Sequence, residues 1–244
     1  MRFFLGTRNQ YKVQEHARIL NPLQLKLLVI DAPDPEETES NFEGNAIIKA
    51  QAYCSHIRDQ QMTGLAKRCG GRDGALNFMR AARYWIISED SGLIVPALGG
   101  LPGPWSARLD DFAEVDTHVG TLAGYVATGR GRDEIDLANN RRVLELMRAV
   151  PFERRAAYFA ASLIVVDIDG QVLFRGLGKC EGWIADEMRG SNGFGYDPIF
   201  VHGRMPNHTF AELDRQRKDL LSHRRQVLTQ FTAWLGTQLR DMED

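Results

Sequence analysis

The chain begins with Phe3-Phe4-Leu5-Gly6-Thr7-Arg8-Asn9-Gln10-Tyr11-Lys12, in which an apolar run meets a polar turn. The apolar run is typical of a buried strand, and the glycine that follows it ends the run. Beyond the turn, apolar residues recur at the i, i+4 and i+7 positions of one helix face, as Val13, Ala17 and Leu20. A strand, a tight turn and a helix in this order predict an α/β fold.

Strand and helix patterns alternate along the rest of the chain. Apolar runs predict strands over residues 25–30, 85–87 and 156–168, and Asp169-Gly170 predicts a hairpin that returns over residues 172–174. Helical spacing predicts helices over residues 42–57, 115–125, 139–148 and 213–235. Residues 58–84 lose this periodicity and are interpreted as an insertion with one short helix near residues 75–82. No internal repeat or flexible linker interrupts the chain, so we expect one domain over residues 1–244.

The composition excludes several classes of protein. With 30 Lys and Arg against 32 Asp and Glu, the net charge of −2 lacks the basic surplus that nucleic-acid binding requires. No apolar run approaches the ~20 residues of a membrane-spanning helix, and the apolar start is too short for a signal peptide. Cys54, Cys69 and Cys180 form no Cys-x-x-Cys pair, which favours a reducing compartment over a disulfide framework or a zinc site. We therefore expect a cytoplasmic protein with no nucleic-acid or membrane partner.

The first turn is a candidate anion site. A helix N-terminus after a strand presents N–H groups and the positive end of the helix dipole, which favour phosphate. Arg8 and Lys12 add cationic donors there. The segment lacks the Gly-x-x-x-x-Gly-Lys-Ser/Thr spacing of a P-loop, and an ordinary N-cap with solvated basic residues is the alternative.

Two pairs of adjacent acids are candidate metal ligands. Glu36-Glu37 lies in an acidic loop broken by prolines, and Glu89-Asp90 follows the predicted strand at residues 85–87. Adjacent carboxylates beside a core element repel each other unless a cation compensates them. Oxygen ligands without a neighbouring Cys or His cluster suit Mg²⁺ or Mn²⁺ rather than zinc. The alternative is solvated loop charge, which is the simpler interpretation of Glu36-Glu37 taken alone.

Two further segments carry groups suited to a nucleotide base. Gly193-Phe194-Gly195-Tyr196-Asp197-Pro198 places an aromatic ring between two glycines, where the backbone can approach a ligand and the ring can stack on a base. Asp197 can accept a hydrogen bond from the base or the ribose. Hydrogen-bond donors gather near a helix start at Lys218, Ser222, His223 and Arg224. The alternatives are a β-turn with a core aromatic and a solvated basic face.

Taken together, these segments resemble the inosine triphosphate pyrophosphatase family over nearly the whole chain. Five motifs occur in the family's order, and each is weak alone. They are Thr7, Asn9 and Lys12; Asn45-Ala46-Ile47-Ile48-Lys49-Ala50; Glu89-Asp90-Ser91-Gly92-Leu93, followed by Ala97-Leu98-Gly99-Gly100-Leu101-Pro102-Gly103 and Ser106-Ala107-Arg108; Gly193-Phe194-Gly195-Tyr196-Asp197-Pro198-Ile199-Phe200; and Ser222-His223-Arg224.

The resemblance implies a fold and an activity. The implied fold is α/β, with a mixed twisted sheet flanked by helices in two lobes around a central substrate cleft, and the implied assembly is a homodimer. The implied activity is hydrolysis of noncanonical purine nucleoside triphosphates (ITP, dITP and XTP) to the monophosphate and pyrophosphate, which removes them from the nucleotide pool. In such an enzyme, water attacks the α-phosphorus.

The resemblance also implies a role for each matching residue. Asp90 is expected to bind Mg²⁺, for which Mn²⁺ can substitute, and to orient or deprotonate the attacking water. Glu37 is the expected second metal ligand, with Glu89 in support. The residues expected to hold the phosphates are Thr7, Arg8, Asn9, Lys12 and Lys49, with Ser91 contacting the substrate near the metal. Those expected around the base and sugar are Phe194, Gly195, Tyr196 and Asp197, and those expected to recognise the base edge are Lys218, His223 and Arg224.

The chain departs from the family pattern in several places. Gly44 stands where a Glu usually precedes Asn-Ala, Glu89 replaces the usual Asp, and Arg8 stands where Gly is common. The segment 58–84 is longer than in the family. Two other functions stay open, namely a pyrophosphatase with a different nucleotide preference and a non-catalytic module that binds purine nucleotides. The retained acids argue against the second, because a binding module needs no site for a metal and a water.

Overall fold

A mixed six-stranded sheet with the strand order β2-β1-β3-β6-β7-β8 organises the computed structural model, which describes residues 1–240. β1 (Arg2–Gly6) pairs in parallel with β2 (Leu27–Val29) and with β3 (Tyr84–Ile94). β6 (Ala156–Val166) lies between β3 and β7 (Val172–Ile184), and β7 pairs antiparallel with β8 (Phe200–His202). The predicted α/β class, with a mixed sheet and flanking helices, is confirmed.

The chain forms two compact units, and three strands contribute residues to both. The first unit contains residues 1–90, 162–177 and 226–240, and the second contains residues 91–161 and 178–225. On β3 the boundary falls between Asp90 and Ser91. A single domain over residues 1–244 stays a prediction.

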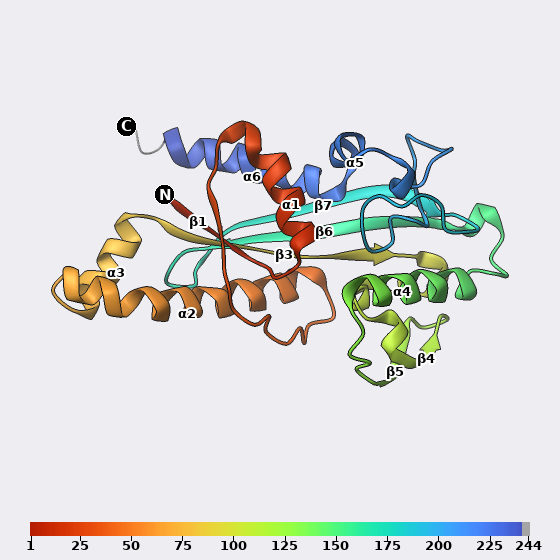
Figure 1. Ribbon diagram of the computed structural model, residues 1–244, viewed down its shortest axis with the longest axis horizontal. Helices are drawn as coiled ribbons and strands as arrows, with labels where there is room; N and C mark the ends of the chain where they lie inside the picture. Colours follow the sequence, from red (N-terminus) through yellow and green to blue (C-terminus); the bar gives the residue numbers. More distant parts are fainter. Residues whose placement is uncertain (241–244) are drawn as a thin grey trace. The chain divides into compact units, whose positions relative to one another are not determined.

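In the first unit, helices cover both faces of the strands (Figure 1). α1 (Gln10–Leu20) and α6 (His223–Arg240) lie on one face, and α2 (Phe42–Arg68) and α3 (Arg72–Ala81) lie on the other. The alternation of side chains along β1 and β3 accounts for this division. Phe4 and Ile86 share a core with Ala50 of α2, whereas Phe3 and Trp85 make aromatic contacts with α6.

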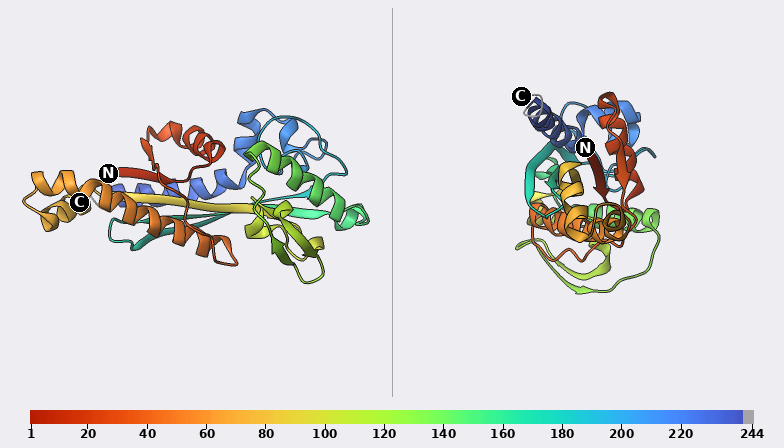
Figure 2. Two further views of the ribbon diagram at one scale, coloured as in Figure 1. Left: turned by 60° about the horizontal axis from the view of Figure 1, so that its bottom comes forward. Right: turned by 90° about the vertical axis from the view of Figure 1, so that its left-hand side faces the viewer.

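The second unit combines parts of β3, β6 and β7 with β8, α4 (Arg132–Leu146) and α5 (Arg215–Leu221). It also contains a separate hairpin of β4 (Phe112–Asp116) and β5 (Thr121–Tyr125), which lies beside α4 (Figures 1 and 2). Its core includes Leu93, Leu109, Phe200 and Phe210. Short 3₁₀ turns along the chain lie at Asn21–Leu23, Pro96–Leu98, Gly103–Trp105, Leu109–Asp111, Phe152–Arg154 and Phe210–Glu212.

The helix predicted over residues 115–125 is wrong, because β4 and β5 occupy this stretch as an antiparallel hairpin. Asp116 Oδ1 accepts hydrogen bonds from the N–H groups of His118 (2.8 Å) and Val119 (3.4 Å). Gly120 then adopts a positive φ of 69°, a conformation that favours glycine. Such bonds from a side chain to the nearby backbone stabilise a turn in place of a helix.

Residues 58–84 are more helical than predicted. α2 continues to Arg68 and ends before Gly70 and Gly71, which both have positive φ. The short helix predicted near residues 75–82 is confirmed as α3, although it begins earlier, at Arg72. The final helix predicted over residues 213–235 is divided into α5 and α6, because Ser222 between them has an extended backbone. Although α2 is long, no helix within residues 1–240 combines the length and apolar character needed to span a membrane.

Candidate functional site

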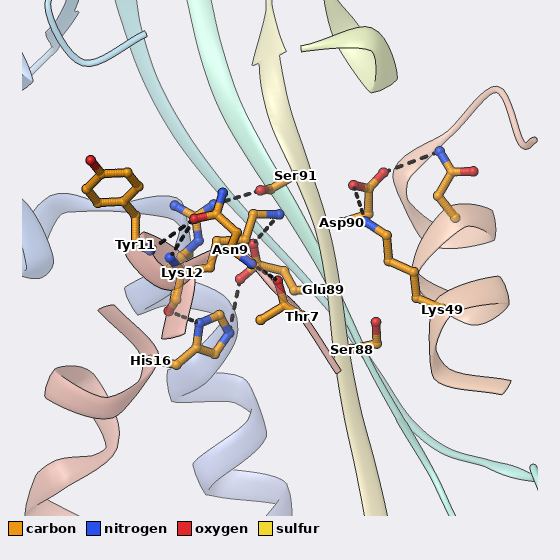
Figure 3. A network of polar contacts seen from close by, with 12 residues as sticks. Thr7, Asn9, Tyr11, Lys12, His16, Lys49, Ser88, Glu89, Asp90 and Ser91 are labelled. Atoms are coloured by element: carbon orange, nitrogen blue, oxygen red, sulfur yellow. Dashed lines mark hydrogen bonds and ion pairs between the residues drawn. The ribbon is translucent and has the colours of Figure 1, made fainter. Parts of the chain in front are cut away.

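Glu89 and Asp90 are consecutive residues of β3, and their side chains point to opposite faces of that strand (Figure 3). Because β3 continues past them to Ile94, the alternation of a β-strand applies to both. Glu89 faces α1, where it contacts Lys12, and Asp90 faces α2, where it contacts Lys49. The two acids therefore belong to two different side-chain clusters of the first unit.

Asp90 belongs to a carboxylate cluster, which we define as Glu37, Asn45, Lys49 and Asp90. Asn45 and Lys49 are one helical turn apart on α2, and each approaches one oxygen of Asp90. Asn45 Nδ2 lies 3.3 Å from Oδ2, and Lys49 Nζ lies 3.3 Å from Oδ1. Lys49 Nζ also forms an ion pair with Glu37 Oε1. The N–H of Glu39 donates to Asn45 Oδ1 (2.9 Å), which ties the loop that carries Glu37 to α2.

The core of this carboxylate cluster is buried, and its charges affect one another. Asp90 is 5% exposed and Lys49 is 7% exposed. Burial raises the pKa of Asp90 against the opposing effect of Lys49 and Lys12. Burial by itself lowers the pKa of Lys49, but the carboxylates of Asp90 and Glu37 outweigh this effect and raise it. The result is a protonated lysine beside a carboxylate that is more basic than usual, which suits acceptance of a proton from water.

The donor set of the carboxylate cluster fits Mg²⁺. Glu37 and Asp90 both contact the ammonium group of Lys49, so the fold already brings two carboxylates to one cation. Within residues 1–240, no group of three or more His, Cys, Asp or Glu side chains is arranged to hold a metal. Mg²⁺ is commonly bound by one or two carboxylates together with water and substrate phosphates, so two carboxylates are sufficient. Glu89, the predicted supporting ligand, points to the face of β3 opposite to that of Asp90 (Figure 3).

A second cluster, at the start of α1, holds Lys12 in place. Asn9 caps the helix, because its Oδ1 accepts hydrogen bonds from N–H groups of the first turn (3.0 and 3.3 Å). Its own N–H donates to Thr7 Oγ1 (3.2 Å). Lys12 Nζ and His16 Nε2 approach the two oxygens of the buried Glu89, at 3.4 and 3.1 Å. Glu89 therefore orients Lys12 in the structure. Arg8, which lies in the turn before α1, is exposed.

The second unit contains an aromatic cluster, which we define as Ser91, Phe194, Asp197, Lys218 and Arg224. Lys218 Nζ lies 4.6 Å and Arg224 Cζ lies 5.2 Å from the centroid of the Phe194 ring. Asp197 Oδ2 accepts a hydrogen bond from the N–H of Phe194 (2.8 Å) and pairs with Lys218. Arg224 Nη2 donates to Ser91 Oγ (2.7 Å). The cluster joins a partly exposed ring to two buried cations, which suits stacking and donation to a flat, polar group.

Tyr196 and His223, both predicted to contact the base or sugar, lie in the core of the second unit. Tyr196 is 3% exposed, and its buried hydroxyl has no hydrogen-bond partner among residues 1–240. Burial raises the pKa of Tyr196 well above its usual range. His223 is 4% exposed and stacks on Phe159, with ring centroids 5.0 Å apart. The structure gives both rings a packing role, and their contacts with a ligand stay predictions.

We expect Tyr196→Phe to leave the free energy of unfolding unchanged or to raise it by up to about 1 kcal/mol, since it removes a buried hydroxyl that has no partner. Urea denaturation measures this change. Tyr196→Ala is the control, and it should lower the free energy of unfolding by about 3–5 kcal/mol because it leaves a cavity. A clear loss of stability in Tyr196→Phe would show that the hydroxyl is bonded and would contradict the packing role.

Sequence patterns assign no role to Asn45 or His16, although both belong to these clusters. Asn45 is part of a family motif, and its spacing of four residues from Lys49 is the signal that places it on the Asp90 side of α2. His16 carries no comparable signal. It is fully buried, and its Nδ1 lies 2.8 Å from the carbonyl oxygen of Lys12.

Comparison with known proteins shows which proteins the chain resembles. The family model described as the Ham1 family matches residues 3–234. The chain is 36% identical over 246 residues to a dITP/XTP pyrophosphatase of Exiguobacterium sibiricum, with 98% of this chain and 99% of the relative covered. It is 30% identical over 253 residues to a protein of the same name from an Anaeromyxobacter species, with 99% of each covered. The resemblance inferred from the sequence motifs is confirmed.

Solved structures agree with this assignment. A HAM1 protein from Coxiella burnetii is 30% identical, with a TM-score of 0.70 over 97% of this chain and 99% of that one. The Ham1 protein of Staphylococcus aureus is 27% identical, with a TM-score of 0.68 over 98% of this chain and 100% of that one. The similarity therefore extends over nearly the full length in sequence and in structure.

Proposed function

Because the chain belongs to the Ham1 family, we propose that it hydrolyses noncanonical purine nucleoside triphosphates (ITP, dITP and XTP) to the monophosphate and pyrophosphate and so removes them from the nucleotide pool. The dITP/XTP pyrophosphatases that it resembles support this substrate class. The observation that carries the proposal is the buried carboxylate of Asp90, held by Lys49 and Asn45 beside Glu37. We assign phosphate binding to the residues of the carboxylate cluster and of the turn before α1, and recognition of the base to the residues of the aromatic cluster.

At the phosphate end, Asp90 is the residue that orients water and accepts its proton. Lys49 and Asn45 each contact one of its oxygens and fix its orientation. Lys12 and Lys49 offer positive charge to the substrate phosphates and to the leaving pyrophosphate, with help from Thr7, Arg8 and Asn9. Mg²⁺, which Mn²⁺ can replace, would be held by Glu37 and Asp90 and would neutralise charge on the phosphates.

At the base end, Phe194 offers a ring for stacking, and Lys218 and Arg224 offer hydrogen-bond donors. Hypoxanthine and xanthine carry a carbonyl oxygen where adenine carries an amino group. Donors from these two residues match the oxygen and oppose the amine, and a mispaired buried donor costs about 1–3 kcal/mol. Asp197 holds Lys218 and the backbone of Phe194 together, which keeps the donor and the ring in fixed relation.

The assembly and the location are further parts of the proposal. We propose a cytoplasmic homodimer that binds a small nucleotide and no nucleic acid or membrane. Light scattering during size-exclusion chromatography would show twice the 27.5 kDa chain mass for a homodimer.

The test is pyrophosphate release from a panel of nucleotides, with and without Mg²⁺. We expect kcat/KM for ITP and XTP to exceed that for ATP by about 10- to 100-fold, from the cost of the mispaired donor, and we expect EDTA to abolish release. Added Mg²⁺ or Mn²⁺ should restore it. Equal or better hydrolysis of dTTP or UTP would favour a pyrophosphatase with another preference. Binding of ITP without pyrophosphate release in Mg²⁺ would favour a non-catalytic module.

A further inference from the structure

The loop that carries Phe194 is held by two polar side chains of α4 that neither the motifs nor the proposed chemistry uses. Asp136 Oδ2 accepts a hydrogen bond from the N–H of Gly195 (2.9 Å). Asn140 Nδ2 donates to the carbonyl oxygen of Gly195 (2.8 Å) and to that of Asp136 (2.6 Å). Both backbone polar groups of Gly195 are therefore bonded to side chains one turn apart on the same helix.

This attachment is buried and specific. Asp136 is 7% exposed and Asn140 is 2% exposed, and such groups are costly to bury unless they are bonded. Asp136 Oδ1 lies 3.1 Å from Arg132 Nε, so the carboxylate also forms an ion pair one turn earlier on α4. Gly195 has a positive φ of 60°, a conformation that favours glycine. The helix thus fixes the backbone at the residue directly after Phe194.

Phe194 is fixed on its other side by Asp197, which bonds its N–H and pairs with Lys218. Two independent attachments therefore define the backbone that carries the ring. A ring on a fixed backbone loses less conformational freedom when a ligand binds, which strengthens binding without any new contact to the ligand.

We infer that Asp136 and Asn140 are positioning residues for base recognition, because they hold Gly195 and thereby set the orientation of the Phe194 ring. This inference rests on the proposed function, in which Phe194 stacks on the base. It predicts that these residues affect binding of the base and leave binding of the phosphates unchanged.

The test measures binding of two product fragments, IMP and pyrophosphate, by calorimetry. Asp136→Ala should weaken binding of IMP by about 10-fold, since it removes one hydrogen bond to a charged group, and should leave pyrophosphate binding within about twofold. Asn140→Asp keeps the shape but replaces the donor with an acceptor, so it should weaken IMP binding at least as much. Asp136→Asn is the matched control. It retains an oxygen acceptor and loses only the partly exposed pair with Arg132, so IMP binding should stay within about threefold of the wild type.

A double variant distinguishes positioning from a general loss of structure. In the Phe194→Ala background, Asp136→Ala should cause no further loss of IMP binding, because the ring through which it acts is gone. Full additivity of the two losses, or equal weakening of IMP and pyrophosphate, would overturn the inference. The wild type tests the proposed function, and the variants test the inference. A wild type that binds neither fragment contradicts the proposed function. If the wild type is active and the variants bind IMP as well as it does, only the inference is contradicted. Urea denaturation identifies a variant that fails to fold. If Asp136→Ala fails to fold, IMP binding by Asn140→Asp tests the inference in its place.

Discussion

Asp90→Asn should lower kcat for pyrophosphate release from ITP by about 10²- to 10⁴-fold, the usual contribution of a general base, while the protein keeps its fold. The amide has nearly the shape of the carboxylate, and its oxygen can still accept from Lys49 or Asn45. It cannot take a proton from water, and it is a poorer metal ligand. Initial rates at saturating ITP and Mg²⁺ measure the change, and far-UV circular dichroism checks the fold.

Glu89→Gln is the matched control, since it makes the same chemical change at the neighbouring residue. Glu89 lies on the other face of β3 and contacts Lys12 and His16. We therefore expect a higher KM for ITP, by about 10-fold, from a less well held Lys12, and a kcat within about threefold of the wild type. Equal losses of kcat in the two variants would contradict the separate roles, and an active Asp90→Asn would contradict the assignment of Asp90 as the base.

The sequence motif does not predict that the side chains of Glu89 and Asp90 point in different directions. The motif identifies both acids, but its polar residues resemble the end of a strand, where side-chain directions are not fixed. The structure extends β3 through them to Ile94, and period-two alternation then separates the acids. β3 pairs with β1 as far as Ser88 and lies next to β6 on its other side. Neither neighbouring strand is visible in residues 88–92 themselves.

Local patterns predicted some parts of the fold well and others poorly, for physical reasons. The first strand, the turn and α1 were correct because Asn9 caps the helix through contacts within four residues. The hairpin of β4 and β5 was missed because its apolar residues fit a helical spacing, whereas Asp116 and Gly120 set the turn. The attachment of Gly195 to α4 joins residues 55 and 59 positions apart, so no local pattern contains it.

Lys49→Met should have the second large effect, because Lys49 is the cation shared by Glu37 and Asp90. Breaking a buried ion pair from one side leaves a charge without a partner, which lowers the free energy of unfolding by about 3 kcal/mol. Loss of this charge beside the phosphates should also lower kcat/KM for ITP by about 10²-fold. Urea denaturation at neutral pH and steady-state kinetics measure the two effects. Arg175→Met removes the cation of an exposed pair with Glu43 and should leave both quantities nearly unchanged.

The double variant Lys49→Met/Asp90→Asn shows whether the instability comes from charge or from packing. If the uncompensated carboxylate of Asp90 destabilises Lys49→Met, then neutralising it should recover part of the lost free energy of unfolding, although activity stays low. If instead the lysine stem stabilises α2 by packing alone, the second substitution should recover nothing. Recovery is expected because Asp90 is 5% exposed and its other hydrogen bond comes from the neutral amide of Asn45, which cannot balance its charge.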